Sequence, residues 1–128
     1  MDLTDIGGEG STIAEAASDD GVTTCSVAGP LAPAVGFAVV LPTATWTQRY
    51  LQLGCGGLCG RVSLGEVGAA AGCAPLNAGG FAIAATDMGH QADDSAWGDD
   101  PQKRADFAHR ANHLTALAAR RLVEALYG

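Results

Sequence analysis

The stretch that most constrains this chain is residues 49–60, RYLQLGCGGLCG, in which a short apolar segment runs directly into a glycine-rich loop. Tyr50, Leu51 and Leu53 suit a buried strand. Four of the next seven residues are glycines, which leave the backbone free to turn tightly and to approach a ligand closely. Such a loop presents unpaired N–H groups, which suit either a phosphate site or an oxyanion hole.

The spacing of the glycines decides between these two uses. A dinucleotide fingerprint has glycines at its first, third and sixth positions, but counting from Gly54 and Gly56 the sixth residue is Cys59. A P-loop needs a Gly-Lys-Ser/Thr sequence, and none follows. What remains is the loop after the third strand of an α/β-hydrolase, which supplies one N–H to the oxyanion.

Size and charge limit the class of protein. A chain of 128 residues with 48% hydrophobic residues is typical of one globular domain. Lys and Arg total 7 against 14 Asp and Glu, so the net charge of -7 repels nucleic acids and anionic membranes, and we expect neither as a partner. No apolar run approaches the roughly 20 residues that span a bilayer.

The chain divides into an N-terminal tail and a folded domain. Residues 1–24 are acidic, rich in small residues and without clear periodicity, which predicts a flexible tail. Residues 25–128 are predicted to form a partial α/β domain. Its strands are expected at residues 35–41, 50–53 and 80–86, and the last of these, a continuous run of small apolar residues, is predicted to be covered on both faces.

A long amphipathic helix is predicted at residues 102–126, where apolar residues recur at steps of three and four. Asp100 and Pro101 are a typical helix start, and Gly128 would cap the end. The order of three strands followed by a helix fits the first part of an α/β sheet.

Several short blocks follow one another from about Cys25 to the last residue: 37–42, Trp46, 49–54, 56–58 with Gly60, 80–82, 86–90, Trp97, 107–113 and 127–128. In content and order, these blocks resemble the tannase/feruloyl esterase family of α/β-hydrolases. The resemblance implies the N-terminal part of an α/β-hydrolase sheet, incomplete, because such a fold normally needs roughly 250 residues.

The resemblance also implies roles for individual residues. The family's loop after this strand donates a backbone N–H to the oxyanion, and by position Gly57 matches the donor best, with Leu58 next. Gly56, Asp87 and His90 would bind substrate or support the site. Structural roles remain open for the glycines, which can simply make a tight turn, and for Asp87 and His90, which are only three residues apart.

The catalytic residues themselves are not expected in this chain. No G-x-S-x-G elbow occurs, and the nearest serine, Ser63, has one residue too many after Gly60. In the resembled family the nucleophile lies in a Cys-Ser-x-Gly-Gly block beyond the matching Tyr-Gly, and the acid and histidine come later still. We therefore expect the 128-residue chain to be inactive alone.

No metal or cofactor is expected. His109 and His113 have the spacing of metal ligands on a helix, but no Glu completes an H-E-x-x-H motif. The four cysteines contain no C-x-x-C pair, so zinc is disfavoured. In an exported protein a Cys59–Cys73 disulfide would close the loop beside the oxyanion strand, whereas in an intracellular one free thiols are the alternative.

The function implied by the resemblance is hydrolysis of a carboxylic ester, with a phenolic-acid ester as substrate and a serine acyl-enzyme as intermediate. The alternative is a non-catalytic remnant or interaction module that pairs its open sheet with another chain, including self-association of the fragment. Family members are commonly secreted, but the first ten residues, MDLTDIGGEG, are not a secretory signal, so the compartment stays open.

Overall fold

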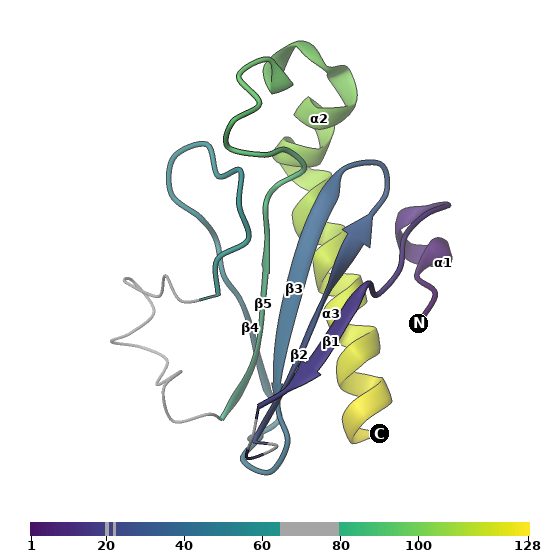
Figure 1. The fold of residues 1–128 in the computed structure, drawn as a ribbon, viewed down its shortest axis with the longest axis vertical. Helices are drawn as coiled ribbons and strands as arrows, with labels where there is room; N and C mark the ends of the chain where they lie inside the picture. The colour runs from purple at the N-terminus through teal and green to yellow at the C-terminus, as the bar shows by residue number, and fades with distance from the viewer. Residues whose placement is uncertain (20, 22, 65–79) are drawn as a thin grey trace.

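The computed structural model describes residues 1–19, 21, 23–64 and 80–128, and Figure 1 shows its α/β arrangement of a five-stranded sheet and a long C-terminal helix. The strand order is β1-β2-β3-β5-β4. The elements are α1 (Thr4–Gly7), β1 (Glu15–Ser18), β2 (Thr24–Leu31), β3 (Val35–Pro42), β4 (Arg49–Gln52), β5 (Phe81–Thr86), a 3-10 turn (Trp97–Asp99), α2 (Pro101–Ala105), a π-helical turn (Asp106–Arg110) and α3 (Ala111–Tyr127).

The sheet is mixed. The pairs β1–β2, β2–β3 and β3–β5 are antiparallel, whereas β4 runs parallel to β5 with Leu51 opposite Ile83. The chain passes from β3 to the outer strand β4 and returns to place β5 between them (Figure 1). Because β4 and β5 are parallel, their carboxyl ends lie side by side at the same end of the sheet, and the loops that follow them meet there.

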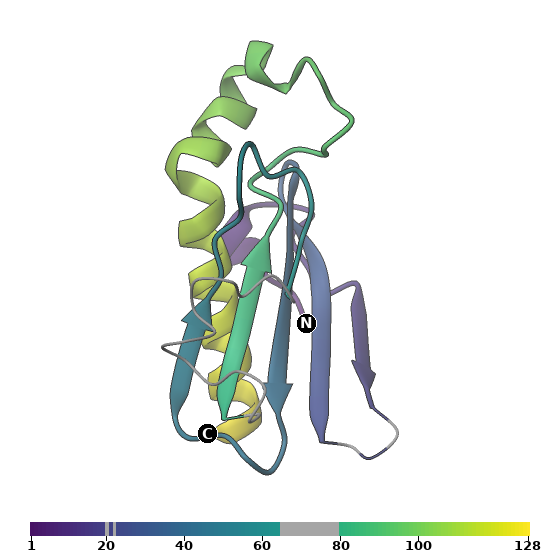
Figure 2. The same cartoon turned by 90° about the vertical axis from the view of Figure 1, so that its left-hand side faces the viewer.

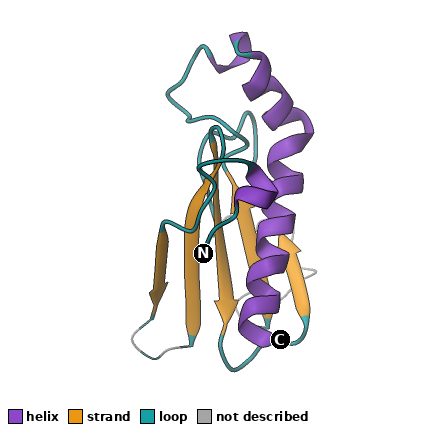
Figure 3. Cartoon of the chain, turned by 90° about the vertical axis from the view of Figure 1, so that its right-hand side faces the viewer, coloured by secondary structure: helices purple, strands orange, loops and turns teal. Residues whose placement is uncertain are grey.

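The hydrophobic core lies between the sheet and α3. Strand β3 alternates in burial because every second side chain faces the helix, and Phe37, Val39 and Leu41 are almost completely buried. Ala118 and Ala119 of α3 are fully buried. Figures 2 and 3 show the helix along one face of the sheet, with α1 on the same side.

The three predicted strands and the predicted helix are confirmed, each to within one residue at either end. Cover on both faces of residues 80–86 was also predicted. Ala82 and Ala84 are buried in the core with α3, and Ala85 on the other face is buried as well, whereas Phe81 and Ile83 on that face are only partly buried among the described residues.

The helix begins as the sequence predicts. The Asp100 carboxylate accepts hydrogen bonds from the backbone N–H groups of Gln102 (2.8 Å) and Lys103 (3.3 Å), and Pro101 occupies the first turn. At the other end the N–H of Gly128, which has a φ of 90°, donates to the backbone carbonyl oxygen of Glu124. The π-helical turn at Asp106–Arg110 was not predicted.

The N-terminal segment is the main correction to the sequence analysis. Instead of a flexible tail over residues 1–24, the structure has α1, strand β1 paired with β2, and Leu3 fully buried in the core. Strand β2 was not predicted either, because Gly29 and Pro30 interrupt the apolar pattern of its sequence. A Cβ on Gly29 would lie 2.1 Å from the carbonyl oxygen of Thr12, so the glycine gives the N-terminal segment room to approach.

Candidate functional site

The candidate site lies where the loops after β4 and β5 meet. The Leu53 N–H donates to Ala84 O (2.8 Å) and continues the β4–β5 pairing by one residue. Farther along, the Gly60 N–H donates to Asp87 O (3.2 Å), and Gly60 O accepts from the Ala92 N–H (2.8 Å). These bonds fix both ends of the 54–59 segment, which we call the glycine loop, to β5 and its following turn.

Gly60 is a glycine for a steric reason. Its φ is 94°, and a Cβ built on it would lie 2.6 Å from both the backbone nitrogen and the Cα of Ala92. No side chain fits there without moving the neighbouring loop. Gly60 is thus needed for the close contact between the loop after β4 and the loop after β5.

The tip of the glycine loop is open to solvent. A Cβ built on Gly56 or Gly57 would meet no atom within 4 Å, and Leu58 is 64% exposed. Gly57 has a φ of 59°, a left-handed conformation, and the Cys59 N–H closes the turn on Gly56 O (3.2 Å). Among the described residues, no hydrogen-bond acceptor is found for the N–H groups of Gly57 and Leu58, so both are available to a ligand.

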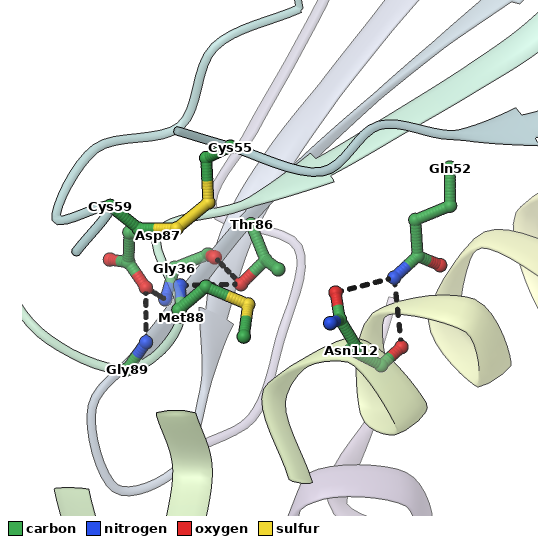
Figure 4. The surroundings of a disulfide bond; sticks show 9 residues. All are labelled: Gly36, Gln52, Cys55, Cys59, Thr86, Asp87, Met88, Gly89 and Asn112. Carbon is green, nitrogen blue, oxygen red and sulfur yellow. Dashed lines mark hydrogen bonds between the residues drawn. A yellow bond between two sulfur atoms is a disulfide. The ribbon is translucent and has the colours of Figure 1, made fainter. Parts of the chain in front are cut away.

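A disulfide closes the glycine loop. Cys55 and Cys59 are bonded, with their Cα atoms 5.5 Å apart (Figure 4). This corrects the predicted Cys59–Cys73 pairing, and Cys73 itself lies outside the described residues. The turn at the tip brings the two ends of the C-x-x-x-C sequence together. Cys25 is half-buried and free.

Asp87 is buried at the carboxyl end of β5, only 2% exposed. Its carboxylate accepts from the backbone N–H groups of Gly36 (3.0 Å) and Gly89 (2.8 Å) and from the Gln91 amide (2.9 Å). The Thr86 hydroxyl donates to Gly36 O (2.8 Å), so both residues tie β5 to the start of β3 (Figure 4).

Burial raises the pKa of the Asp87 carboxyl above its ordinary value of 3.8, while the bonds from Gly89 and Gly36, the nearby His90 and the Gln91 amide act in the opposite direction. The carboxylate thus serves as a hydrogen-bond acceptor between two strands. No hydrogen bond between Asp87 and His90 is found, so the structure does not join them as a dyad.

His90 belongs to an aromatic cluster. It is 3% exposed and stacks on Trp97 with ring centroids 4.3 Å apart, and Phe107 contacts both rings. Its Nδ1 atom has no hydrogen-bond partner among the described residues. The cluster fixes the loop after β5 against the helix that follows it.

Two polar connections at the site were not predicted. The Gln52 amide, at the end of β4, donates to the carbonyl and side-chain oxygens of Asn112 (2.9 and 3.1 Å; Figure 4). Asp106 is completely buried and accepts from Arg110 (2.9 Å). The spacing of Asp106 and Arg110, four residues apart on a helix, is a signal that could have identified the second pair.

A hollow of about 360 Å³ lies beside the glycine loop, within the size range of small-molecule pockets. No histidine lines it among the described residues, so Ser63, although it lines the hollow, has no activating base there. The lining residues are Cys55, Gly56, Cys59, Arg61, Ser63 and Ala92.

A metal site is not supported in the part of the chain that the structure describes. No three side chains of His, Cys, Asp or Glu come together there, and His109 and His113 are both exposed. In the same part of the chain, no helix has the length and apolar character needed to cross a membrane.

Comparison with known proteins adds family evidence to this geometry. The model of the family described as tannase and feruloyl esterase matches residues 20–128. An uncharacterized esterase of Xanthomonas campestris pv. campestris is 35% identical over 108 residues. That match covers 79% of this chain but only 18% of the relative, so the chain spans a small part of the relative's length. No solved structure matches the chain.

Proposed function

Because the chain belongs to the tannase and feruloyl esterase family, we propose that it is the oxyanion-loop part of a carboxylic ester hydrolase. The observation that carries this proposal is the open tip of the glycine loop, which lies beyond the carboxyl ends of the parallel strands β4 and β5. There the N–H groups of Gly57 and Leu58 face no acceptor among the described residues. Loops at strand carboxyl ends are where α/β sheets place their ligands.

The proposed reaction proceeds through a serine acyl-enzyme. A serine from outside residues 1–128 attacks the ester carbonyl, and the alcohol leaves with the proton that the serine hydroxyl gives up. Water then adds to the acyl-enzyme, releases the acid and returns a proton to the serine. In each step the carbonyl oxygen becomes an oxyanion, and the Gly57 N–H donates to it, with Leu58 as the second candidate donor. Asp87 and His90 act indirectly, by holding the loop after β5 that supports Gly60.

The substrate class rests on the family alone. The family description supports an ester of a phenolic acid, and the hollow beside Cys55 and Ser63 is large enough for part of such a molecule. We therefore propose a small phenolic ester as the substrate of the whole enzyme, with no cofactor.

The test is a chimera in which residues 20–128 replace the matching segment of the Xanthomonas esterase, assayed on methyl ferulate and p-nitrophenyl acetate. The unmodified esterase is the control. We expect the chimera to hydrolyse at least one ester and the isolated 128-residue chain to give no turnover above a mock purification. Saturable turnover by the isolated chain, surviving Ser63→Ala, would show that the chemistry has been misplaced.

A non-catalytic interaction module is the second candidate. It is favoured by one observation: β4 is an edge strand of the sheet, and among the described residues it pairs only with β5. An unpaired strand edge can add a strand from another chain. If the chimera is active and its Gly57→Ala variant is not, the esterase function is favoured over the interaction module.

A further inference from the structure

The glycine loop has firm anchors at both ends and almost none between them. At its start Leu53 is buried and bonded to Ala84, and at its end Gly60 is buried and bonded to Asp87 and Ala92. Between these anchors Gly54, Gly56 and Gly57 have open space where a side chain would be. Among the described residues, the only hydrogen bond found for the backbone of this segment is that from Cys59 to Gly56.

The two cysteines differ in how they are held. Cys59 is half-buried and packs against the core, whereas Cys55 is exposed. Their disulfide therefore ties the free side of the loop to its anchored side. Gly57, with its left-handed conformation, lies inside the ring that this bond closes.

We propose that the Cys55–Cys59 disulfide is the positioning element for the Gly57 and Leu58 N–H groups, and that opening it makes the loop tip mobile without unfolding the sheet. The physical reason is that three glycines give the tip many alternative backbone conformations, and in the part of the chain that the structure describes these are opposed by the covalent ring and one hydrogen bond. The sheet should persist because Leu53 and Gly60 keep their own bonds to β5 and the loop after it.

The kinetic consequence rests on the proposed function. A donor that contributes only in the transition state affects kcat more than KM when it is misplaced. Loss of one oxyanion donor lowers kcat by on the order of 10²- to 10³-fold, which sets the upper limit for opening the disulfide. We expect kcat to fall toward this limit with KM nearly unchanged.

The structural test uses the full 128-residue chain and does not depend on activity. Dithiothreitol breaks the S–S bond to give two thiols while the reagent closes to its own cyclic disulfide. NMR order parameters of the Gly56 and Gly57 amides should be near those of a rigid backbone before reduction and below about 0.6 after it. The double variant Cys55→Ser/Cys59→Ser should match the reduced chain, and amides of β5 should not shift.

Cys25→Ser is the matched control, because Cys25 is the free cysteine of the described chain. It should leave the order parameters of the loop unchanged. Rigid loop amides after reduction, or peptide mapping that pairs Cys59 with Cys73, would overturn the inference. If the loop amides become mobile but opening the disulfide leaves kcat of the chimera unchanged, the disulfide positions the loop but the loop is not an oxyanion hole. The two proposals are therefore tested independently.

Discussion

Arg110→Met is the change whose effect on stability follows most directly from the structure. The Arg110 guanidinium donates to Asp106 (2.9 Å) and to the carbonyl oxygens of Gly7 (3.0 Å) and Ala32 (2.7 Å). Asp106 is completely buried, and its Oδ2 atom has no partner among the described residues. Without Arg110, the amide of Gln102 (3.0 Å) is the remaining described partner of a buried carboxylate.

Removing one partner of a buried ion pair costs about 3–5 kcal/mol, since the other charge is left uncompensated. The Arg110 side chain is 26% exposed, so water can reach part of the site and we expect the lower half of that range. For a chain of this size, such a loss lowers the melting temperature by roughly 10–15 °C. Asp106→Asn in the Arg110→Met background should recover much of it, because a neutral amide costs less to bury.

The assay is thermal unfolding followed by circular dichroism at one fixed protein concentration, so that association does not change the comparison. Arg120→Met is the control, because the Arg120–Glu124 pair is also four residues apart on the helix but is 77% and 59% exposed. A melting temperature for Arg110→Met within the error of Arg120→Met would refute the argument. So would a double variant less stable than either single change.

Three further predictions follow from the site and the sheet. Gly57→Ala in the active chimera should fold, because a Cβ meets no atom within 4 Å, but the φ of 59° is strained for alanine, so the N–H should move and kcat should fall by about 10²- to 10³-fold with little change in KM. A raised KM at constant kcat would assign the loop to substrate binding. Burial raises the folded-state pKa of Asp87, so the contribution of Asp87 to stability should fall as pH rises from 3.8 through the raised pKa. Carboxyls with a lowered pKa, such as Asp5 and Asp94, act in the opposite direction, so the measurement is the difference in urea stability between the unmodified chain and Asp87→Asn; a difference that does not change with pH would contradict this. The isolated chain should self-associate through the unpaired edge of β4; a monodisperse 12.8 kDa monomer in light scattering would contradict this.

The elements that sequence could predict are those whose signals are local. Strand β3 is a run of apolar residues that includes β-branched valines, and it ends at Pro42, which lacks an N–H for further pairing. The helix after Asp100 is marked by its capping side chain and by Pro101, both within one turn. The glycine loop was located for the same reason, because its glycines are adjacent in sequence.

The features that sequence could not predict depend on contacts between distant residues. Residues 1–19 contain too few apolar residues to show a pattern, yet Leu3 is buried because the rest of the chain provides a core for it. Arg110 bonds Gly7, 103 residues away in sequence, and nothing local to either residue indicates this. The Cys55–Cys59 disulfide is a local exception: the two cysteines are only four residues apart, but their pairing depends on the backbone turn at Gly56 and Gly57, which the glycines permit without specifying.

The arrangement around Asp87 favours a supporting role over a catalytic one for the 86–90 block. Its carboxylate is committed to the Gly36 and Gly89 backbones, and a Cβ on Gly89 would lie 2.5 Å from the Cβ of Asp106. The turn after β5 is therefore packed closely between the start of β3 and the π-helical turn. Gly60 forms its hydrogen bonds with this fixed turn, so the end of the glycine loop is fixed as well. An oxyanion donor, the role proposed for the Gly57 N–H, must stay in place while charge develops on the substrate, and a buried, hydrogen-bonded support behind the loop meets that requirement.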